Sequence, residues 1–295
     1  MSLFGENLAL ALTVEGMALR GLVFADRSVE SWFNIPLSPD SVKGGLISAP
    51  EKVGKVMAEA IRERGLPRKG VLAALPSSGS VAETLTLART KKGKLDELVK
   101  REVKRLAIAS PDSNYLYWEL LSAEGDKQQV SVLTTPKENV RNLVAACRAA
   151  GITLKAIDLK PFALTRAVKC KDGIIVHGEM DCIEIVIVNN FSTSVFRGIP
   201  LEAAAPGWDT AISQLLRELP ITIDYYNHTH HDSPISPDIA IYLTGELALD
   251  SALRQRVAEA AKRPVGSIEP PVDCPKNFPM VQYMTSIGLM LKSRV

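Results

Sequence analysis

Two stretches of the chain, 164 positions apart, share the same order of apolar and polar residues. Residues 10–24 and 174–188 each consist of an apolar run, a short break that contains a glycine, and a second apolar run of about strand length. That pattern is typical of a β-hairpin. The internal repeat therefore predicts two hairpins that open two similar α/β lobes, which face each other across a cleft.

The pattern also predicts a small α+β segment inside the first lobe. Helical spacing over residues 50–64, closed by Gly65, and a short apolar strand over 70–75 belong to the beginning of that lobe. Residues 80–151 then follow a strand–helix–strand–strand–helix order and are rich in charged residues. We expect this segment to be an inserted domain, and such insertions often carry the binding surface for a partner.

The second lobe is predicted to continue after its hairpin with helices and one more strand. A helix is expected from Gly207 to Leu219, with a continuation that Pro220 would bend, because proline removes a helical hydrogen bond. A strand over 239–243, a helix over 249–262 and a terminal helix over 280–292 follow. The predicted boundaries are 1–79 with 152–170 for the first lobe and 171–295 for the second.

Composition is that of an ordinary globular protein. Hydrophobic residues make up 46% of the chain and charged residues 23%, and the net charge is +2, so nucleic acid is not an expected partner. No basic segment precedes the first apolar run, and no apolar run approaches the length of a membrane span, so we expect a cytoplasmic protein. Four scattered cysteines without a C-x-x-C pair favour reduced, buried thiols.

Five short segments carry a family resemblance. They are LPSSGSV at 75–81, AAGITLKAIDLKPFALTRAV at 149–168, GIPL at 198–201, ITIDYY at 221–226 and IYLTGELA at 241–248. In these segments and in the order of its predicted elements, the chain resembles the family of the type IV pilus assembly protein PilM. That family belongs to the actin-like ATPase superfamily, together with the cell-division protein FtsA.

The resemblance implies an α/β fold with an actin-like (ribonuclease H-like) two-lobed core, with 80–151 as the inserted subdomain and the terminal helix 280–292 bridging the lobes. A second small subdomain, one wall of the nucleotide cleft in the family, is expected to be largely missing, because Gly198 and Asp224 are only 26 positions apart. The resemblance also implies a cytoplasmic protein at the inner face of the cytoplasmic membrane. There it would bind the tail of a PilN-like inner-membrane protein and contact the membrane only through that partner.

The nucleotide site implied by the resemblance departs from the family pattern. Actin-like ATPases hold phosphates between two hairpins with an Asp-x-Gly pattern, where this chain has Thr13-Val14-Glu15 and His177-Gly178-Glu179. A glutamate beside a polyanion is repelled by about 4 kcal/mol at ~4 Å if the effective dielectric constant is roughly 20. The equivalents of nucleotide-binding residues are Thr13, Glu15, Gly16, His177, Gly178, Glu179 and Gly245. We expect this site to be degenerate, with no catalytic or metal-binding residues and no cofactor, and ATP with magnesium is a disfavoured ligand.

Several residues have a plainer interpretation as well. Glu15 and Glu179 could be solvated turn residues that point away from an empty cleft, and Arg20 could contact an anion, although an exposed strand arginine is the favoured interpretation. The segment 227–232, with three histidines and an aspartate, could bind zinc or nickel, but a solvated helix end is favoured.

The segment 89–105 has eight basic residues and three acidic ones. It could meet an acidic partner or an anionic membrane leaflet, and a solvated helix face is the favoured interpretation.

These observations predict a PilM-like cytoplasmic adaptor or scaffold of a type IV pilus or related secretion apparatus that acts by binding. A groove between the first lobe and the inserted domain is expected to take an extended peptide. One alternative is an active actin-like ATPase of pilus assembly, and another is a sugar or acetate kinase, which shares the core. Self-association stays open.

Overall fold

The computed structural model describes residues 8–25, 27–201, 208–231 and 233–292. Contacts divide the chain into two compact units, one formed by 1–78 with 142–295 and the other by Gly79–Arg141. The second unit overlaps most of the segment 80–151 that the sequence marks as an insertion. Each unit is described by itself.

The first half of the larger unit is built on a five-stranded sheet with the order β10-β6-β1-β2-β3. Its strands are β1 (Leu8–Glu15), β2 (Ala18–Ala25), β3 (Ser28–Pro36), β6 (Lys69–Leu75) and β10 (Thr153–Leu159). The first three strands pair antiparallel in sequence, whereas β6 and β10 join parallel. The predicted hairpin at 10–24 is confirmed, with Leu8 opposite Ala25 and Glu15 opposite Ala18.

The second half repeats this arrangement with a four-stranded sheet of order β13-β12-β11-β14. Its strands are β11 (Gly173–Gly178), β12 (Cys182–Asn189), β13 (Ser192–Pro200) and β14 (Ile241–Gly245). An antiparallel run β11-β12-β13 with a parallel strand beside β11 has the same topology as β1-β2-β3 with β6 beside β1. The 164-residue repeat in the sequence is therefore a repeat of structure.

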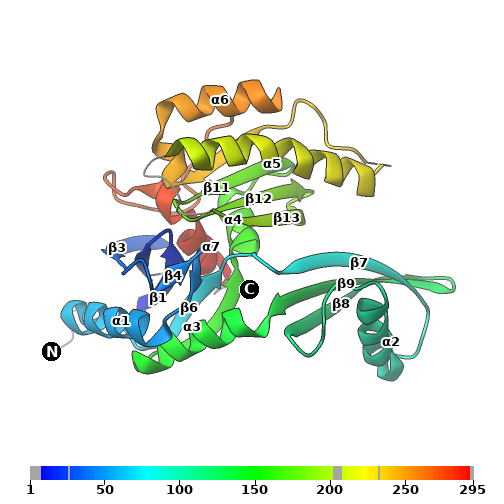
Figure 1. Ribbon diagram of the computed structural model, residues 1–295, viewed down its shortest axis with the longest axis horizontal. Coiled ribbons are helices and arrows are strands. Elements are labelled where there is room, and N and C mark those ends of the chain that lie inside the picture. Colours follow the sequence, from blue (N-terminus) through cyan, green and yellow to red (C-terminus); the bar gives the residue numbers. More distant parts are fainter. Residues whose placement is uncertain (1–7, 26, 202–207, 232, 293–295) are drawn as a thin grey trace. The chain divides into compact units, whose positions relative to one another are not determined.

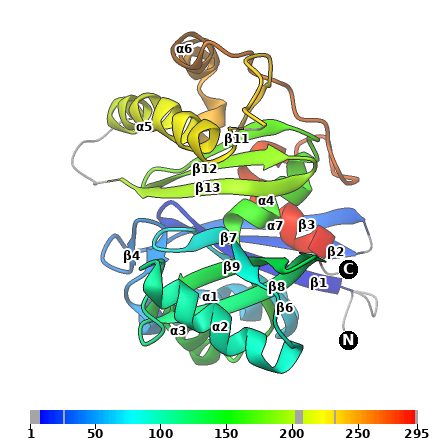
Figure 2. The ribbon, with the colours of Figure 1, turned by 90° about the vertical axis from the view of Figure 1, so that its right-hand side faces the viewer.

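Two helices lie between the sheets and join them into one core (Figures 1 and 2). These are α4 (Lys160–Val168) and α7 (Met284–Lys292), the latter preceded by a 3-10 turn η2 (Met280–Tyr283). Ala163 of α4 and Ile287 of α7 are fully buried in one apolar cluster with Leu22 of the first sheet and Val186 of the second. The packed core thus runs continuously from one sheet to the other.

The outer faces of the sheets are covered by further helices. Helix α1 (Pro50–Arg64) packs closely against the end of α3 (Lys137–Ala149). The contact requires a glycine at position 54, since a side chain there would begin 2.7 Å from Ala149 Cβ and 2.8 Å from the Ala146 carbonyl oxygen. On the second sheet lie α5 (Trp208–Thr229) and α6 (Ser251–Ala261), shown in yellow and orange in Figure 1. Helix α5 continues through Pro220 as one element, while the predicted first residue of that helix, Gly207, lies outside the described residues.

As predicted, the chain leaves little room for a second small subdomain. Strand β13 ends at Pro200 and helix α5 begins at Trp208, so only seven residues connect them. A short hairpin, β4 (Val42–Lys43) with β5 (Leu46–Ile47), was not predicted from the sequence. Among the described residues, no helix combines the length and the apolar character that crossing a lipid bilayer requires.

The smaller unit is an antiparallel sheet of order β7-β9-β8 with one helix on it. Its elements are β7 (Val81–Ala88), α2 (Lys92–Arg105), β8 (Asn114–Glu124) and β9 (Lys127–Pro136), followed by the first residues of α3. Leu95, Val99 and Val103 of α2 are buried against Val130 and Val132 of β9. The strand–helix–strand–strand–helix order of the sequence is confirmed.

Candidate functional site

The turns of the two repeated hairpins meet in the larger unit. Gly16 follows β1 in a left-handed backbone conformation (φ +59°), and a side chain placed there would begin 3.5 Å from Glu179 Oε2. At the end of β14, a side chain on Gly245 (φ +80°) would begin 3.0 Å from Glu179 Oε1 and 2.5 Å from the carbonyl oxygen of Gly178. The carboxylate of Glu179 therefore lies among the turns at Gly16, Gly178 and Gly245, residues that the family resemblance assigns to a nucleotide site.

Arg20 holds this carboxylate from the first sheet. Its Nη1 donates to Glu179 Oε1 at 2.7 Å and its Nη2 donates to Glu179 Oε2 at 3.0 Å, a two-point arrangement that matches the planar guanidinium to the carboxylate. The same guanidinium donates to Glu246 Oε1 at 2.7 Å and to the Gln282 carbonyl at 2.9 Å. One buried arginine thus connects β2 to the turn after β11, to the turn after β14 and to the segment before α7.

Lys160 holds the second glutamate. The first residue of α4 extends its ammonium to Glu15 Oε2 at 2.7 Å and to the Val14 carbonyl at 2.9 Å. His177 of β11 approaches the same carboxylate, with Nε2 at 3.1 Å from Glu15 Oε2, while its Nδ1 lies 3.0 Å from Thr244 Oγ1. Glu15 is therefore bound by a cation from its own half of the unit and by an imidazole from the other half.

The structure overturns two sequence-based interpretations. Glu15 and Glu179 are 1% and 0% exposed, so the interpretation that they are solvated turn residues pointing away from an empty cleft is wrong. Arg20 is 0% exposed, so the interpretation that it is an exposed strand arginine is wrong as well. The physical reason is mutual: each charge is buried only because the opposite charges are buried with it.

The remaining residues assigned to the site lie beside this cluster. Thr13 Oγ1 is 3.4 Å from Ser286 Oγ on α7. Gly178 ends β11 where Leu247 packs so closely that a side chain at this glycine would begin 2.2 Å from Leu247 Cδ1. Close packing rather than access for a ligand therefore explains the glycine at position 178.

Charge and burial set the protonation of the cluster. Burial opposes ionisation of Glu15, but Lys160 and His177 hold the pKa of its carboxyl well below its ordinary value. Burial raises the pKa of Glu179 to about 7 despite the opposing attraction of Arg20 and His177. Three glutamates, with Glu246 as the third, face only two permanent cations. One bound proton would make the charges of these five side chains cancel. The raised pKa of Glu179 indicates that its carboxyl group takes up this proton.

Two more carboxylates cross between the halves of the unit. Glu184 of β12 accepts from the backbone N–H of Ser77 at 2.7 Å and from the Ser77 hydroxyl, and burial raises its pKa. Asp181 accepts from the backbone N–H of Gly45 at 2.7 Å. Loop N–H groups of this kind suit a bound anion, and here the anion comes from the chain itself.

Sequence reasoning missed Arg20 as a partner, and it missed Lys160 and Glu184 altogether. The signal was present, because Arg20 lies in the apolar run ALRGLVF and Glu184 in CIEIVIV, where both faces of the strand are expected to be buried. A charge in such a run requires a buried partner, although the run does not say which partner.

A metal ion does not fit the cluster well. Glu15, His177 and Glu179 offer ligand atoms that lie within 4.8 Å of one another. However, Lys160 already donates to the Glu15 carboxylate and Arg20 to the Glu179 carboxylate, and a third cation would be repelled by both.

The histidine-rich segment 227–232 lies at the end of α5. There His230 stacks on Tyr226 with ring centroids 4.3 Å apart, and Asp232 lies outside the described residues.

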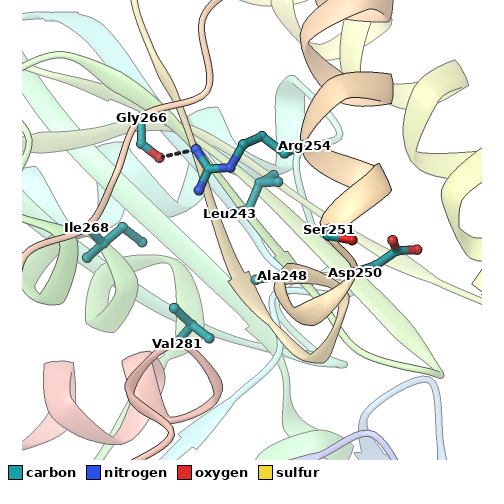
Figure 3. A pocket seen from close by; sticks show the side chains of 8 residues that line it. All are labelled: Leu243, Ala248, Asp250, Ser251, Arg254, Gly266, Ile268 and Val281. Carbon is teal, nitrogen blue, oxygen red and sulfur yellow. Dashed lines mark hydrogen bonds between the residues drawn. The ribbon is translucent and has the colours of Figure 1, made fainter. Parts of the chain in front are cut away.

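A small pocket lies beside the turn after β14 (Figure 3). Its volume is about 100 Å³, and it is lined by Leu243, Ala248, Asp250, Ser251, Arg254, Gly266, Ile268 and Val281. The guanidinium of Arg254 donates to the carbonyls of Val265 and Gly266 at 3.0 and 3.3 Å. Both bonds come from Nη1, so this edge of the guanidinium is engaged by the backbone.

The comparisons with known proteins identify the fold. No family model and no curated protein matches the chain. A chain of a "PilM-PilN type IV pilus biogenesis complex" is similar over 98% of both chains, with a TM-score of 0.76 and 18% identity. The cytoplasmic domain of EpsL, an inner-membrane component of the Vibrio cholerae type II secretion system, is similar over 96% of this chain and 95% of that one, with a TM-score of 0.55 and 11% identity.

A Bacteroides thetaiotaomicron protein described as having an actin-like ATPase fold and unknown function also aligns, over 96% of both chains, with a TM-score of 0.52 and 10% identity. The predicted actin-like fold is therefore confirmed. The sequence resemblance to the PilM family has its counterpart in the structural similarity to the PilM–PilN complex.

Proposed function

We propose that this chain is a PilM-like cytoplasmic scaffold of a type IV pilus or a related secretion apparatus, which acts by binding the cytoplasmic tail of an inner-membrane protein. Two similar structures support the setting, since one belongs to a pilus biogenesis complex and the other is the cytoplasmic domain of an inner-membrane secretion component. Sequence segments such as 149–168 resemble the same family.

The observation that carries the non-enzymatic part of the proposal is the buried ion cluster. Glu179 lies among Gly16, Gly245 and Arg20, and Glu15 lies on Lys160, so carboxylates stand where phosphates would have to bind. A nucleotide would have to displace Glu179 from a two-point ion pair at 0% exposure. Displacing one partner of a buried pair costs about 3–5 kcal/mol, which is a large part of the affinity of an ordinary ligand.

The partner test uses the full chain and a peptide copy of the N-terminal cytoplasmic tail of a PilN-like protein from the same operon. We expect saturable binding in calorimetry, with unchanged affinity when ATP and magnesium are present. A peptide of the same composition in scrambled order is the control. Binding of both peptides alike would remove the scaffold proposal.

The nucleotide test is separate. We expect no shift in melting temperature with ATP and magnesium, and no phosphate release above the rate of the Glu179→Gln variant. The alternative of an active pilus ATPase, and the less favoured sugar or acetate kinase, would both require a wild-type rate that this variant loses.

A further inference from the structure

Helix α2 concentrates positive charge in a chain that is nearly neutral. The segment 89–105 contains eight basic and three acidic residues, a net charge of +5. The whole chain has a net charge of +2, so the other residues together carry −3. Positive charge is therefore concentrated within these 17 residues.

The core of the smaller unit fixes which face of α2 meets solvent. Leu95, Val99 and Val103 are at most 2% exposed and bind the helix to its sheet. The opposite face carries five exposed cations, which are Lys94, Lys100, Arg101, Lys104 and Arg105. From Lys94 to Lys104 this basic face extends about 15 Å, since a helix rises ~1.5 Å per residue.

Most of this charge is not neutralised within the described part of the chain. Lys100 pairs with Asp96 and Arg105 with Glu102, both on the helix itself. Both cations are exposed, so water weakens these pairs. The ion pairs of the described residues include none for Lys94, Arg101 or Lys104. These three cations are available to an external anion.

The shape and chemistry of the face favour one kind of partner. Helix α2 contains no aromatic residue on which a nucleic-acid base could stack. Three of the five cations are lysines, which act as point charges without the two-point geometry that arginine gives a specific protein carboxylate. A convex row of cations of this kind suits the flat surface of an anionic bilayer.

We propose that the basic face of α2 docks on the headgroups of an anionic lipid bilayer. This contact is independent of the scaffold function, because it uses none of the ion cluster and needs no PilN-like tail. It would add a direct membrane contact to a chain expected to reach the membrane only through its partner.

The test is sedimentation of the full chain with vesicles, either of phosphatidylcholine alone or of phosphatidylcholine with phosphatidylglycerol. We expect binding only to the anionic vesicles, and loss of this binding at high salt, because screening shortens the reach of the charges. The variant Lys94→Gln/Arg101→Gln/Lys104→Gln should bind on the order of 100-fold more weakly, since each basic residue contributes roughly fivefold.

The matched control is Lys52→Gln/Lys55→Gln/Arg62→Gln on α1, which removes the same charge from exposed positions elsewhere. It should bind anionic vesicles within a few-fold of wild type, and both triple variants should melt like the wild-type chain. Three results would each overturn the proposal: equal losses in the two triple variants, equal binding to both lipids, or no binding to either. Tighter binding to duplex DNA or to an acidic polypeptide than to anionic vesicles at the same salt would also overturn it, whereas the tail-peptide titration would be unaffected by any of these results.

Discussion

Arg20 and Lys160 are the two side chains on which the buried cluster depends. Each is 0% exposed, and each lies on a glutamate from a hairpin that actin-like proteins use for phosphates. The attraction of Glu179 and of Glu15 raises the pKa of these two cations, against the opposing effect of burial. A cation in this setting cannot lose its partner without a large loss of stability, because water does not reach it.

Replacement of Arg20 should show this directly. Arg20→Met removes the shared partner of Glu179 and Glu246, and we expect unfolding free energy to fall by about 4 kcal/mol, a drop of roughly 10 °C in melting temperature. Thermal unfolding by circular dichroism measures it. Lys52→Met, which breaks an exposed pair with Asp40, is the control and should change little. A double variant Arg20→Met/Glu179→Gln should be less destabilised than the sum of its singles. An Arg20→Met chain as stable as wild type would contradict this account.

Glu179 should also give stability a pH dependence. Its pKa in the folded chain is raised to about 7 from an ordinary 4.5, so the folded state binds more protons between these values than the unfolded state. The stabilisation from this proton is complete below pH ~4.5 and is lost as pH rises through 7, by about 3 kcal/mol in all. Arg20, His177, Glu15 and Glu246 face the group, and Glu15, whose pKa is lowered, loses its contribution only at much lower pH.

The measurement is melting temperature against pH from 5 to 8. Wild type should decline across this interval, and Glu179→Gln, which stays neutral at every pH, should decline much less. A wild-type curve that rises with pH over the same interval would contradict the assigned protonation.

At the residue scale, the sequence predicted where the two glutamates lie but not which side chains they bind. The internal repeat places Glu15 and Glu179 at corresponding hairpin turns, and these turns are close together in the structure. The partners could not be predicted, because Lys160 precedes a proline at the start of a helix and looks like a solvated first-turn residue. Which cation meets which carboxylate is decided by the packing of two sheets that are far apart in the sequence.

Helices α4 and α7 pack with their backbones close together. A side chain on Gly288 of α7 would begin 1.9 Å from the carbonyl oxygen of Ala163 in α4. Arg166 Nε donates to the Gly288 carbonyl at 2.9 Å, which fixes the two helices at this point. The glycine is therefore required by the approach of two backbones, and not by an unusual φ angle.

Gly288→Ala should accordingly destabilise the chain, although alanine normally favours a helix by about 1 kcal/mol. We expect a loss of about 1–3 kcal/mol or more, because backbone atoms rather than a flexible side chain would have to move. Gly93→Ala in α2 is the matched control, since nothing lies within 4 Å of its added carbon, and it should be neutral or slightly stabilising. Denaturant unfolding of both variants measures the difference. Similar effects at the two glycines would contradict the close approach of α4 and α7.

Element prediction succeeded where periodicity was strong and failed where elements were short. The amphipathic helix at 50–64 and the hairpins of both lobes were predicted with nearly their observed bounds. Strands β4 and β5 have two residues each, too few for an alternating pattern, and they were missed. The terminal helix was expected from residue 280, but α7 starts at Met284 because the residues after Pro279 form a 3-10 turn.

For the whole molecule, the internal repeat and the segments that resemble the family sufficed to predict an actin-like core. They could not predict whether the two lobes are bonded to each other. The same sequence pattern is compatible with residues that face solvent in a cleft and with residues that bond across it. In the structure, the pairs Arg20–Glu179, Glu15–His177 and Ser77–Glu184 all cross between the halves of the larger unit. An apolar cluster with Leu22, Val186 and Ile287 also crosses there.

Both halves of the larger unit should therefore open together. We expect hydrogen exchange of the slowest amides in β1 and β11 to report the same free energy of opening, since the ion cluster and the shared core are lost in one step. Under the proposed scaffold function, ATP with magnesium should leave both sets of amides unchanged. In Arg20→Met, protection should fall in β11 and β14 as well as in β2, since Glu179 and Glu246 lose their partner across the halves. Exchange that is fast in β11–β14 while β1 and β6 stay protected would show instead that the lobes move independently, as a nucleotide-driven hinge requires.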